Sequence, residues 1–106
     1  MTQAELFTAL KSLGLPVAYG SFTTVTLPPF ITYQFASNDD LFADNKNAID
    51  AGNFQVELYT ATKDLAREKL VQDKLKSLSL PYQKLETWID EEKMYQILYE
   101  IQLTGG

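Results

Sequence analysis

Apolar residues return at helical spacing in the first part of the chain. Over residues 2–13 they fall on one face of a helix: Leu6, Phe7, Leu10 and Leu13, with Ala9 at the edge of that face. Thr2 and Glu5 have the spacing of a capping box, in which each side chain bonds a free backbone amide of the other residue. Gly14 suits the left-handed position that ends many helices. The pattern predicts an amphipathic helix over residues 2–13.

A second helical pattern begins after Thr62 or Asp64, either of which can cap it, and runs to about Leu78. Its apolar residues form a wide stripe: Ala66, Leu70, Val71, Leu75 and Leu78. Arg67 and Lys74 project near the middle of that stripe. Either their aliphatic stems lie along the edge of the core with the charges in water, or they mark a surface that meets a partner. The remaining charges alternate in sign, as on a solvated face with i,i+4 pairs: Lys63, Asp64, Glu68, Lys69, Asp73 and Lys76.

Both helical patterns end in nearly the same seven residues. Leu10-Lys-Ser-Leu-Gly-Leu-Pro16 returns as Leu75-Lys-Ser-Leu-Ser-Leu-Pro81, with Ser79 in the place of Gly14. A proline removes a backbone donor and crowds the turn before it, so each helix must stop and the chain must continue in extended form. We therefore expect two similar helix-to-strand corners, although Leu, Lys and Ser are common enough for the match to be a coincidence.

Alternation with a period of two marks the strands. It occurs in segments 30–36, 53–60, 82–88 and 94–103, with a shorter extended piece at 17–20. The last two long segments are separated by a short polar stretch, which is typical of a hairpin. Together with the helices, the pattern predicts one α+β domain over residues 1–106. Its sheet would be mostly antiparallel, of about four strands, with both helices packed on one face.

The other side of this sheet is expected to be exposed, and its residues are neutral or weakly charged. They are Thr32, Gln34, Gln55, Glu57, Tyr59, Gln96 and Gln102. Such residues suit contact with another protein, and they also occur in ordinary sheet packing.

Residues 37–53 form the polar centre of the chain and are rich in the Asn and Asp that turns require. The apolar Leu41, Phe42 and Ile49 lie among them, so we expect an irregular strand or an extended arm. An exposed apolar pair is unfavourable unless a partner covers it. Phe42 therefore either folds back onto its own core or, with Leu41, contacts a partner.

Composition excludes several classes of function. The 106 residues contain 14 Asp and Glu against 9 Lys and Arg, and this net charge of −5 argues against electrostatic wrapping of nucleic acid. The chain has neither histidine nor cysteine, so it lacks the commonest general base, the commonest transition-metal ligands and any disulfide. It has no secretion signal pattern and no apolar run of membrane-spanning length, so a cytosolic product is expected.

Two sets of carboxylates are candidates for chemistry. The first set could bind a hard cation such as calcium, but it lacks the spacing of a calcium loop and suits turns: Asp39, Asp40, Asp44 and Asp50. The second set falls at the predicted hairpin tip, where water keeps a pKa near its ordinary value: Glu86, Asp90, Glu91 and Glu92. The hydroxyls of residues 21–26 have no histidine to activate them. We therefore expect no catalytic residue, no metal and no cofactor.

Several segments, taken in order, resemble one family of proteins. They are Pro29-Phe30-Ile31-Thr32-Tyr33, Phe42-Ala43-Asp44-Asn45-Lys46, Val56-Glu57-Leu58-Tyr59-Thr60 with Lys63-Asp64, Leu80-Pro81-Tyr82 and Tyr95-Gln96-Ile97-Leu98-Tyr99. The chain is similar to the small tail-completion or tail-terminator proteins (head–tail joining, minor tail or capsid proteins) of long-tailed phages and prophages of Gram-positive bacteria. The similarity spans nearly the whole chain in short pieces, none of which is an active-site motif.

The resemblance implies an α+β subunit that assembles into a ring, usually of six, at the head-proximal end of the tail tube. It would be made in the host cytoplasm and incorporated into the virion. Its partners would be copies of itself and tail-tube or neck proteins, with no sequence-specific nucleic acid and no membrane. The family places the segment of residues 42–46, with the acidic loop beside it, in an extended hairpin or arm. The expected interface residues are Leu41, Phe42, Asp44, Lys46, Arg67 and Lys74.

Two alternatives remain at this point. One is a non-catalytic protein-binding or regulatory module, which would be a stable monomer with a defined partner. The other is a small enzyme that uses carboxylates, which would hold a buried Asp or Glu in a cleft with a shifted pKa.

Overall fold

The computed structural model describes residues 1–39, 41–43 and 46–104, with the backbone alone described for residues 41–43 and 46–49. Its elements follow in the order α1 (Gln3–Lys11), β1 (Val17–Tyr19), β2 (Phe30–Asn38), β3 (Leu41–Ala43), β4 (Lys46–Ile49), β5 (Ala51–Thr60), α2 (Leu65–Ser77), β6 (Gln83–Ile89) and β7 (Met94–Thr104).

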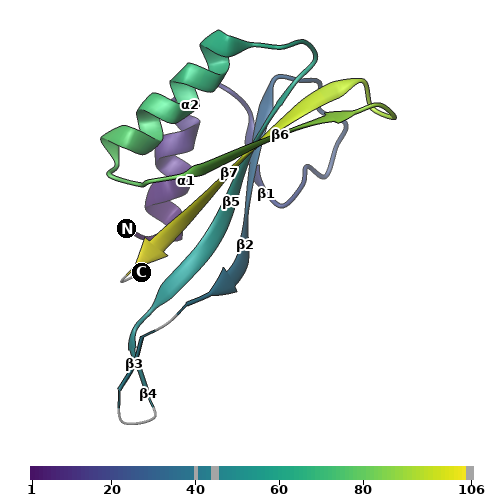
Figure 1. Cartoon of the computed structure of the whole chain (residues 1–106). Coiled ribbons are helices and arrows are strands. Elements are labelled where there is room, and N and C mark those ends of the chain that lie inside the picture. Colours follow the sequence, from purple (N-terminus) through teal and green to yellow (C-terminus); the bar gives the residue numbers. More distant parts are fainter. Residues whose placement is uncertain (40, 44–45, 105–106) are drawn as a thin grey trace.

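The main sheet has five strands in the order β1-β2-β5-β7-β6. Only β1 and β2 run parallel, and the other neighbours are antiparallel. Both helices lie on the same side of this sheet (Figure 1). The predicted α+β class is confirmed, and the fifth strand is β1, which the sequence marked only as a short extended piece.

The core lies between the helices and the sheet. Each helix contributes two buried leucine or valine side chains, Leu6 and Leu10 from α1 and Val71 and Leu75 from α2. The strands contribute the side chains that point toward the helices: Ile31, Tyr33, Phe54, Val56, Leu58, Ile97, Tyr99, Ile101 and Leu103. These residues alternate along their strands as predicted.

Helix α1 begins at the predicted capping box. The Glu5 amide donates to Thr2 Oγ1 at 3.1 Å, and the Thr2 amide donates to Glu5 Oε1 at 2.9 Å. The helix ends at Lys11, with Ser12 as its C-cap, so it is shorter than the pattern suggested. Phe7 is more exposed than predicted, and its ring contacts Tyr33 with a centroid distance of 6.1 Å.

The two corners after the helices have similar backbone geometry. Gly14 has a φ of 82° and Ser79 has a φ of 58°, so both adopt the left-handed conformation. The Gly14 amide donates to the Lys11 carbonyl at 3.2 Å, and the Ser79 amide donates to the Lys76 carbonyl at 3.0 Å. The sequence repeat is therefore a structural repeat and not a coincidence.

Helix α2 covers the sheet with a narrower apolar stripe than predicted. Asp64 caps it by accepting from the Arg67 amide at 3.0 Å. Val71 and Leu75 are buried, whereas Ala66 is exposed and Leu70 is 48% exposed. Glu68, expected on the solvated face, is only 2% exposed. That prediction was wrong because lysines from outside the helix neutralise this carboxylate under the helix.

Residues 37–53 contain a second, two-stranded sheet, which we call the arm and define as β3 and β4. Its strands are antiparallel, with Leu41 opposite Ile49 and Ala43 opposite Lys46. The arm continues from the ends of β2 and β5 and projects away from the helices and the main sheet (Figure 1).

Candidate interaction surface

The face of the main sheet that carries no helix, here called the open face, presents side chains in rows. Residues paired across neighbouring strands point to the same side of a sheet, so the pairing register defines each row. One row is Phe30, Tyr59, Gln96 and Thr87, the next is Thr32, Glu57, Leu98 and Leu85, and the third is Gln34, Gln55, Glu100 and Gln83. Most of these side chains are uncharged, which suits contact with a protein surface better than contact with a phosphate backbone.

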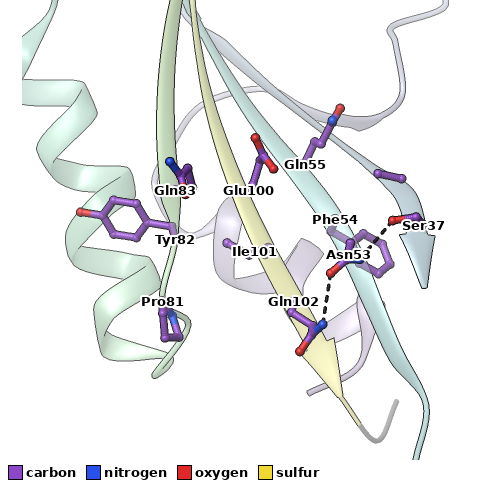
Figure 2. A pocket seen from close by; sticks show the side chains of 11 residues that line it. Ser37, Asn53, Phe54, Gln55, Pro81, Tyr82, Gln83, Glu100, Ile101 and Gln102 are labelled. Atoms are coloured by element: carbon purple, nitrogen blue, oxygen red, sulfur yellow. Dashed lines mark hydrogen bonds between the residues drawn. The ribbon is translucent and has the colours of Figure 1, made fainter. Parts of the chain in front are cut away.

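A shallow groove of about 600 Å³ crosses the end of this face that is nearer the arm. Figure 2 shows the residues that line it, most of which are polar. Asn53 donates to Ser37 Oγ at 3.0 Å, and Gln102 donates to Asn53 Oδ1 at 3.1 Å. Hydrogen bonds between strands hold these amides in place. Gln83 and Tyr82 of the β6 side complete the groove.

A buried carboxylate lies farther along the same face. Glu57 is 6% exposed, and its Oε2 accepts from Tyr59 Oη at 2.8 Å and from Gln96 Nε2 at 2.9 Å. Burial and the hydrogen bond to Glu57 raise the pKa of the Tyr59 hydroxyl. This cluster holds three side chains of neighbouring strands in one fixed arrangement.

Thr32 and Glu57 were expected to be exposed, and that expectation was wrong. Residues of the loop after β1 return over this end of the open face. Gly20, Ser21, Phe22 and Thr26 line a hollow of about 250 Å³ together with residues of the sheet, among them Thr32 and Tyr59. The rings follow one another across the loop and the strands, with centroid distances of 5.2 Å for Phe22–Phe30 and 4.8 Å for Phe30–Tyr59.

A cluster of four charges lies on the opposite, helix-covered face. Lys63 Nζ is 2.7 Å from Glu68 Oε2, and Lys84 Nζ is 2.6 Å from Glu68 Oε1. Lys63 also pairs with Glu86. Burial opposes the charge of Glu68, but the bonds from the two lysines outweigh it, so the pKa of this carboxyl falls below its ordinary value.

Where the pKa of a carboxyl group is shifted, it is lowered, so the charged form of that group is favoured. The pKa is lowered in Glu5 by bonds from Thr2, in Asp64 by bonds from Arg67 and in Asp90 by Lys93 and Trp88. A general acid needs the opposite shift, toward neutral pH. These carboxylates therefore serve as helix caps and ion-pair partners.

The predicted hairpin-tip carboxylates separate into two environments. Asp90, Glu91 and Glu92 lie at the turn between β6 and β7, where Lys93 Nζ is 2.8 Å from Asp90 Oδ1. Glu86 is not at the tip but within β6, facing α2. The prediction that Glu86 lies at the tip was wrong, because the turn comprises residues 90–93 and Glu86 lies inside the strand before it, where its side chain pairs with Lys63.

The four aspartates that were candidates for a cation are only partly described. Asp39 Oδ2 accepts from Asn53 at 2.9 Å, and Asp50 is exposed between β4 and β5. Asp40 and Asp44 lie outside the described residues. Among residues 1–39, 41–43 and 46–104, no three acidic side chains gather into a group that could hold a metal ion.

The predicted interface residues lie in two separate places. Leu41 and Phe42 are on β3 and Lys46 is on β4, while their side chains and the whole of Asp44 lie outside the described residues. Arg67 pairs within α2, with Nη1 2.6 Å from Asp64 Oδ2, and Lys74 is half-buried two turns further on. The arm and α2 lie at opposite ends of the molecule (Figure 1), so one copy cannot present all these residues to the same contact.

Sequence reasoning missed the burial of Glu57 and Glu68. Glu68 stands three residues before Val71 and seven before Leu75, which places it in phase with the buried face of the helix. This spacing could have predicted from the sequence that Glu68 is buried. Glu57 had no comparable signal, because the loop that covers its end of the sheet comes from a distant part of the sequence.

No protein-family model matches the chain, and no curated protein matches its sequence. The helices of the described part of the chain are too short and too polar to cross a bilayer.

Proposed function

We propose that the protein is a structural subunit of a phage or prophage tail. In this proposal, copies of the chain form a ring that ends the tail tube and joins it to the neck, and the subunit acts by contact and not by catalysis. The support begins with the resemblance to tail-completion proteins, which runs along nearly the whole chain. The α+β architecture and the largely uncharged open face agree with such a role.

The observation that carries the proposal is the arm. Its two strands pair with each other and with no other described strand. An isolated two-stranded hairpin is marginally stable in water, so an arm of this kind gains most from a neighbour that covers it. Leu41 and Phe42 lie on its first strand. We therefore assign the arm the contact with the next subunit or with the tail tube.

The experiment compares Phe42→Asp with the unchanged protein. The variant should stay folded but lose rings, both alone and on isolated tail tubes, because it places a charge in the proposed contact. Light scattering and negative-stain electron microscopy of the same samples measure this. Val25→Asp is the matched control, because it makes the same kind of change at an apolar residue that is 97% exposed in a loop.

Two results would contradict the proposal. The first is an unchanged protein that stays smaller than a ring at every concentration and does not bind tails. The second is a Phe42→Asp variant that unfolds as an isolated subunit, which would assign Phe42 to its own core.

The amide-lined groove favours a second candidate, a non-catalytic protein-binding module. Its Asn and Gln side chains are held by bonds between strands, and an extended peptide could occupy the 600 Å³ groove. This module would bind its partner without forming rings. Gln55→Lys and Gln102→Lys should then abolish partner binding, whereas the tail function predicts that Phe42→Asp has the larger effect.

A further inference from the structure

Strand β6 forms one edge of the main sheet and has a strand neighbour, β7, on one side only. Six of its seven residues are exposed and the last, Ile89, is half-buried. The backbone amides and carbonyls on its outer side therefore face solvent. Such a row is a template for another strand.

Proline and bulges, two of the usual protections of an edge strand, are missing from β6. It contains no proline, and its pairing with β7 runs without a bulge from Gln83–Glu100 to Ile89–Met94. The opposite edge differs, because β1 has only three residues. Two large apolar side chains of β6 are also exposed, Leu85 at 46% and Trp88 at 42%.

The charges of β6 do not repel a second copy. Lys84 and Glu86 lie in the cluster with Glu68 and Lys63, and these two acids and two bases balance. An edge charge normally prevents pairing because it would be buried without a partner. Here each charge already has a counter-ion on its own subunit.

We propose that β6 pairs antiparallel with β6 of a second copy, around a two-fold axis at Leu85. In this register Leu85 of one copy is opposite Leu85 of the other. Lys84 is then opposite Glu86, and Gln83 is opposite Thr87. The two sheets join edge to edge into one continuous sheet of ten strands, because each copy contributes five.

Charge selects this register over its neighbours. A slip by two residues in one direction sets Lys84 opposite Lys84, and the same slip in the other direction sets Glu86 opposite Glu86. Like charges directly opposite each other destabilise a strand pair, whereas opposite charges stabilise it. Only the register centred on Leu85 gives two Lys–Glu pairs within the strand.

Apolar contacts agree with the same register. Leu85 lies on the open face, where it would cover its counterpart across the axis. Trp88 of one copy would come opposite Tyr82 of the other, on the helix-covered side where the Trp88 ring already contacts Tyr95 at a tilt and the Tyr82 ring packs edge-on against Tyr99. Aromatic pairs are among the more favourable cross-strand contacts.

This pairing does not rest on the proposed tail function. A contact of one patch with the same patch closes at two copies, so it cannot by itself build a ring. The arm lies away from β6 and stays free in the dimer (Figure 1). The arm variant Phe42→Asp should therefore leave the dimer intact, and a β6 variant should remove it, which separates the two proposals.

Light scattering of the full chain over a roughly hundredfold range of concentration is the first test, because an interface of one strand is small and its association weak. In the Phe42→Asp background, which removes the proposed ring contact but not β6, we expect the mass to rise from that of one copy to that of two, and the β6 variants are compared in the same background. Leu85→Asp should keep it at one copy, and the control Val25→Asp should not. A mass of one copy at all concentrations, or a dimer that survives Leu85→Asp with its circular dichroism unchanged, would overturn the proposal.

Cross-linking tests the register without relying on a disruptive variant. The chain has no cysteine, so Leu85→Cys introduces its only thiol. Facing residues of paired strands have Cα atoms about 4.5–5.5 Å apart, within the reach of a disulfide. Under mild oxidation Leu85→Cys should form a linked dimer roughly tenfold faster or more than Thr87→Cys, because only facing thiols have a high effective concentration. Equal rates would rule out the register.

Discussion

Glu68 is a buried carboxylate whose position depends on its ion pairs. Burying a carboxylate is unfavourable unless it is paired, and this one is nearly inaccessible beneath α2. Lys63 approaches it from the loop before the helix and Lys84 from β6. Both lysines stay more than one third exposed, so their own charges remain partly hydrated. The cluster thus ties three segments together at a modest cost in desolvation.

Glu68→Gln should lower the free energy of unfolding at pH 7 by about 1.5–3 kcal/mol, the range for hydrogen bonds to charged groups. The pKa of Glu68 is lowered from 4.5 in the folded protein, so its charge stabilises the fold above that pH. This contribution is lost as the pH falls below 4.5 and through the folded pKa. Urea unfolding at several pH values should show that the free energy of unfolding of the variant decreases less with falling pH than that of the unchanged protein.

Glu91→Gln is the matched control for that measurement, because Glu91 is exposed at the hairpin turn. It should follow the unchanged protein across the whole pH range. A Glu68→Gln curve parallel to that of the unchanged protein would show that the lysines do not hold the Glu68 charge.

The two helix-to-strand corners are the elements that the sequence predicted best. Each depends on local chemistry: leucines at helical spacing, a residue that accepts the left-handed conformation, and a proline that stops the helix. The corners differ in that Gly14 adopts its positive φ without strain, whereas Ser79 carries a side chain there.

Ser79→Gly should therefore raise the free energy of unfolding by about 0.5–1 kcal/mol. The change removes the strain of the left-handed conformation, and this gain is larger than the loss from the entropy that glycine adds to the unfolded chain. Gly14→Ser should lower it by about 1 kcal/mol, because nothing lies within 4 Å of an added Cβ and strain is the main change. Chemical denaturation of both variants measures this. Effects of the same sign would mean that the corners are not equivalent.

Helix α2 was predicted as a helix, but the part of its apolar face that is buried was not. The spacing of apolar residues identified the helix and its buried Val71 and Leu75, but it also placed Leu70 in the core. A wide apolar stripe does not specify which part of it faces the sheet. That choice depends on the sheet, where Tyr99 Oη donates to Gln72 Oε1 at 3.0 Å and Lys84 reaches Glu68.

At the scale of the whole molecule, the main sheet and the arm differ in how many neighbours their strands have. Strands β5 and β7 are each paired on both sides, whereas β3 and β4 have only each other. Stability against local opening should follow this difference. The molecule therefore combines a firmly packed body with a projecting two-stranded arm.

Hydrogen exchange of the free protein should therefore be slowest in β5 and β7 and much faster in β3 and β4. If the arm is covered in the assembled ring, its amides should become protected there while those of β5 and β7 change little. Mass spectrometry of exchanged samples, free and assembled, measures both effects. Arm amides as slow as those of β5 in the free protein would show that the arm is already stable alone.

The sequence by itself determined the α+β class, the helix caps, the corners and most strand boundaries, because these follow from residues near one another in the chain. It also determined that the protein contains neither imidazole nor thiol. Only the tertiary structure decided which polar side chains became buried. Glu68 meets lysines from two other segments, and the loop after β1 returns over Thr32 and Tyr59. Periodicity shows which residues share a face, but what covers that face depends on contacts between distant segments.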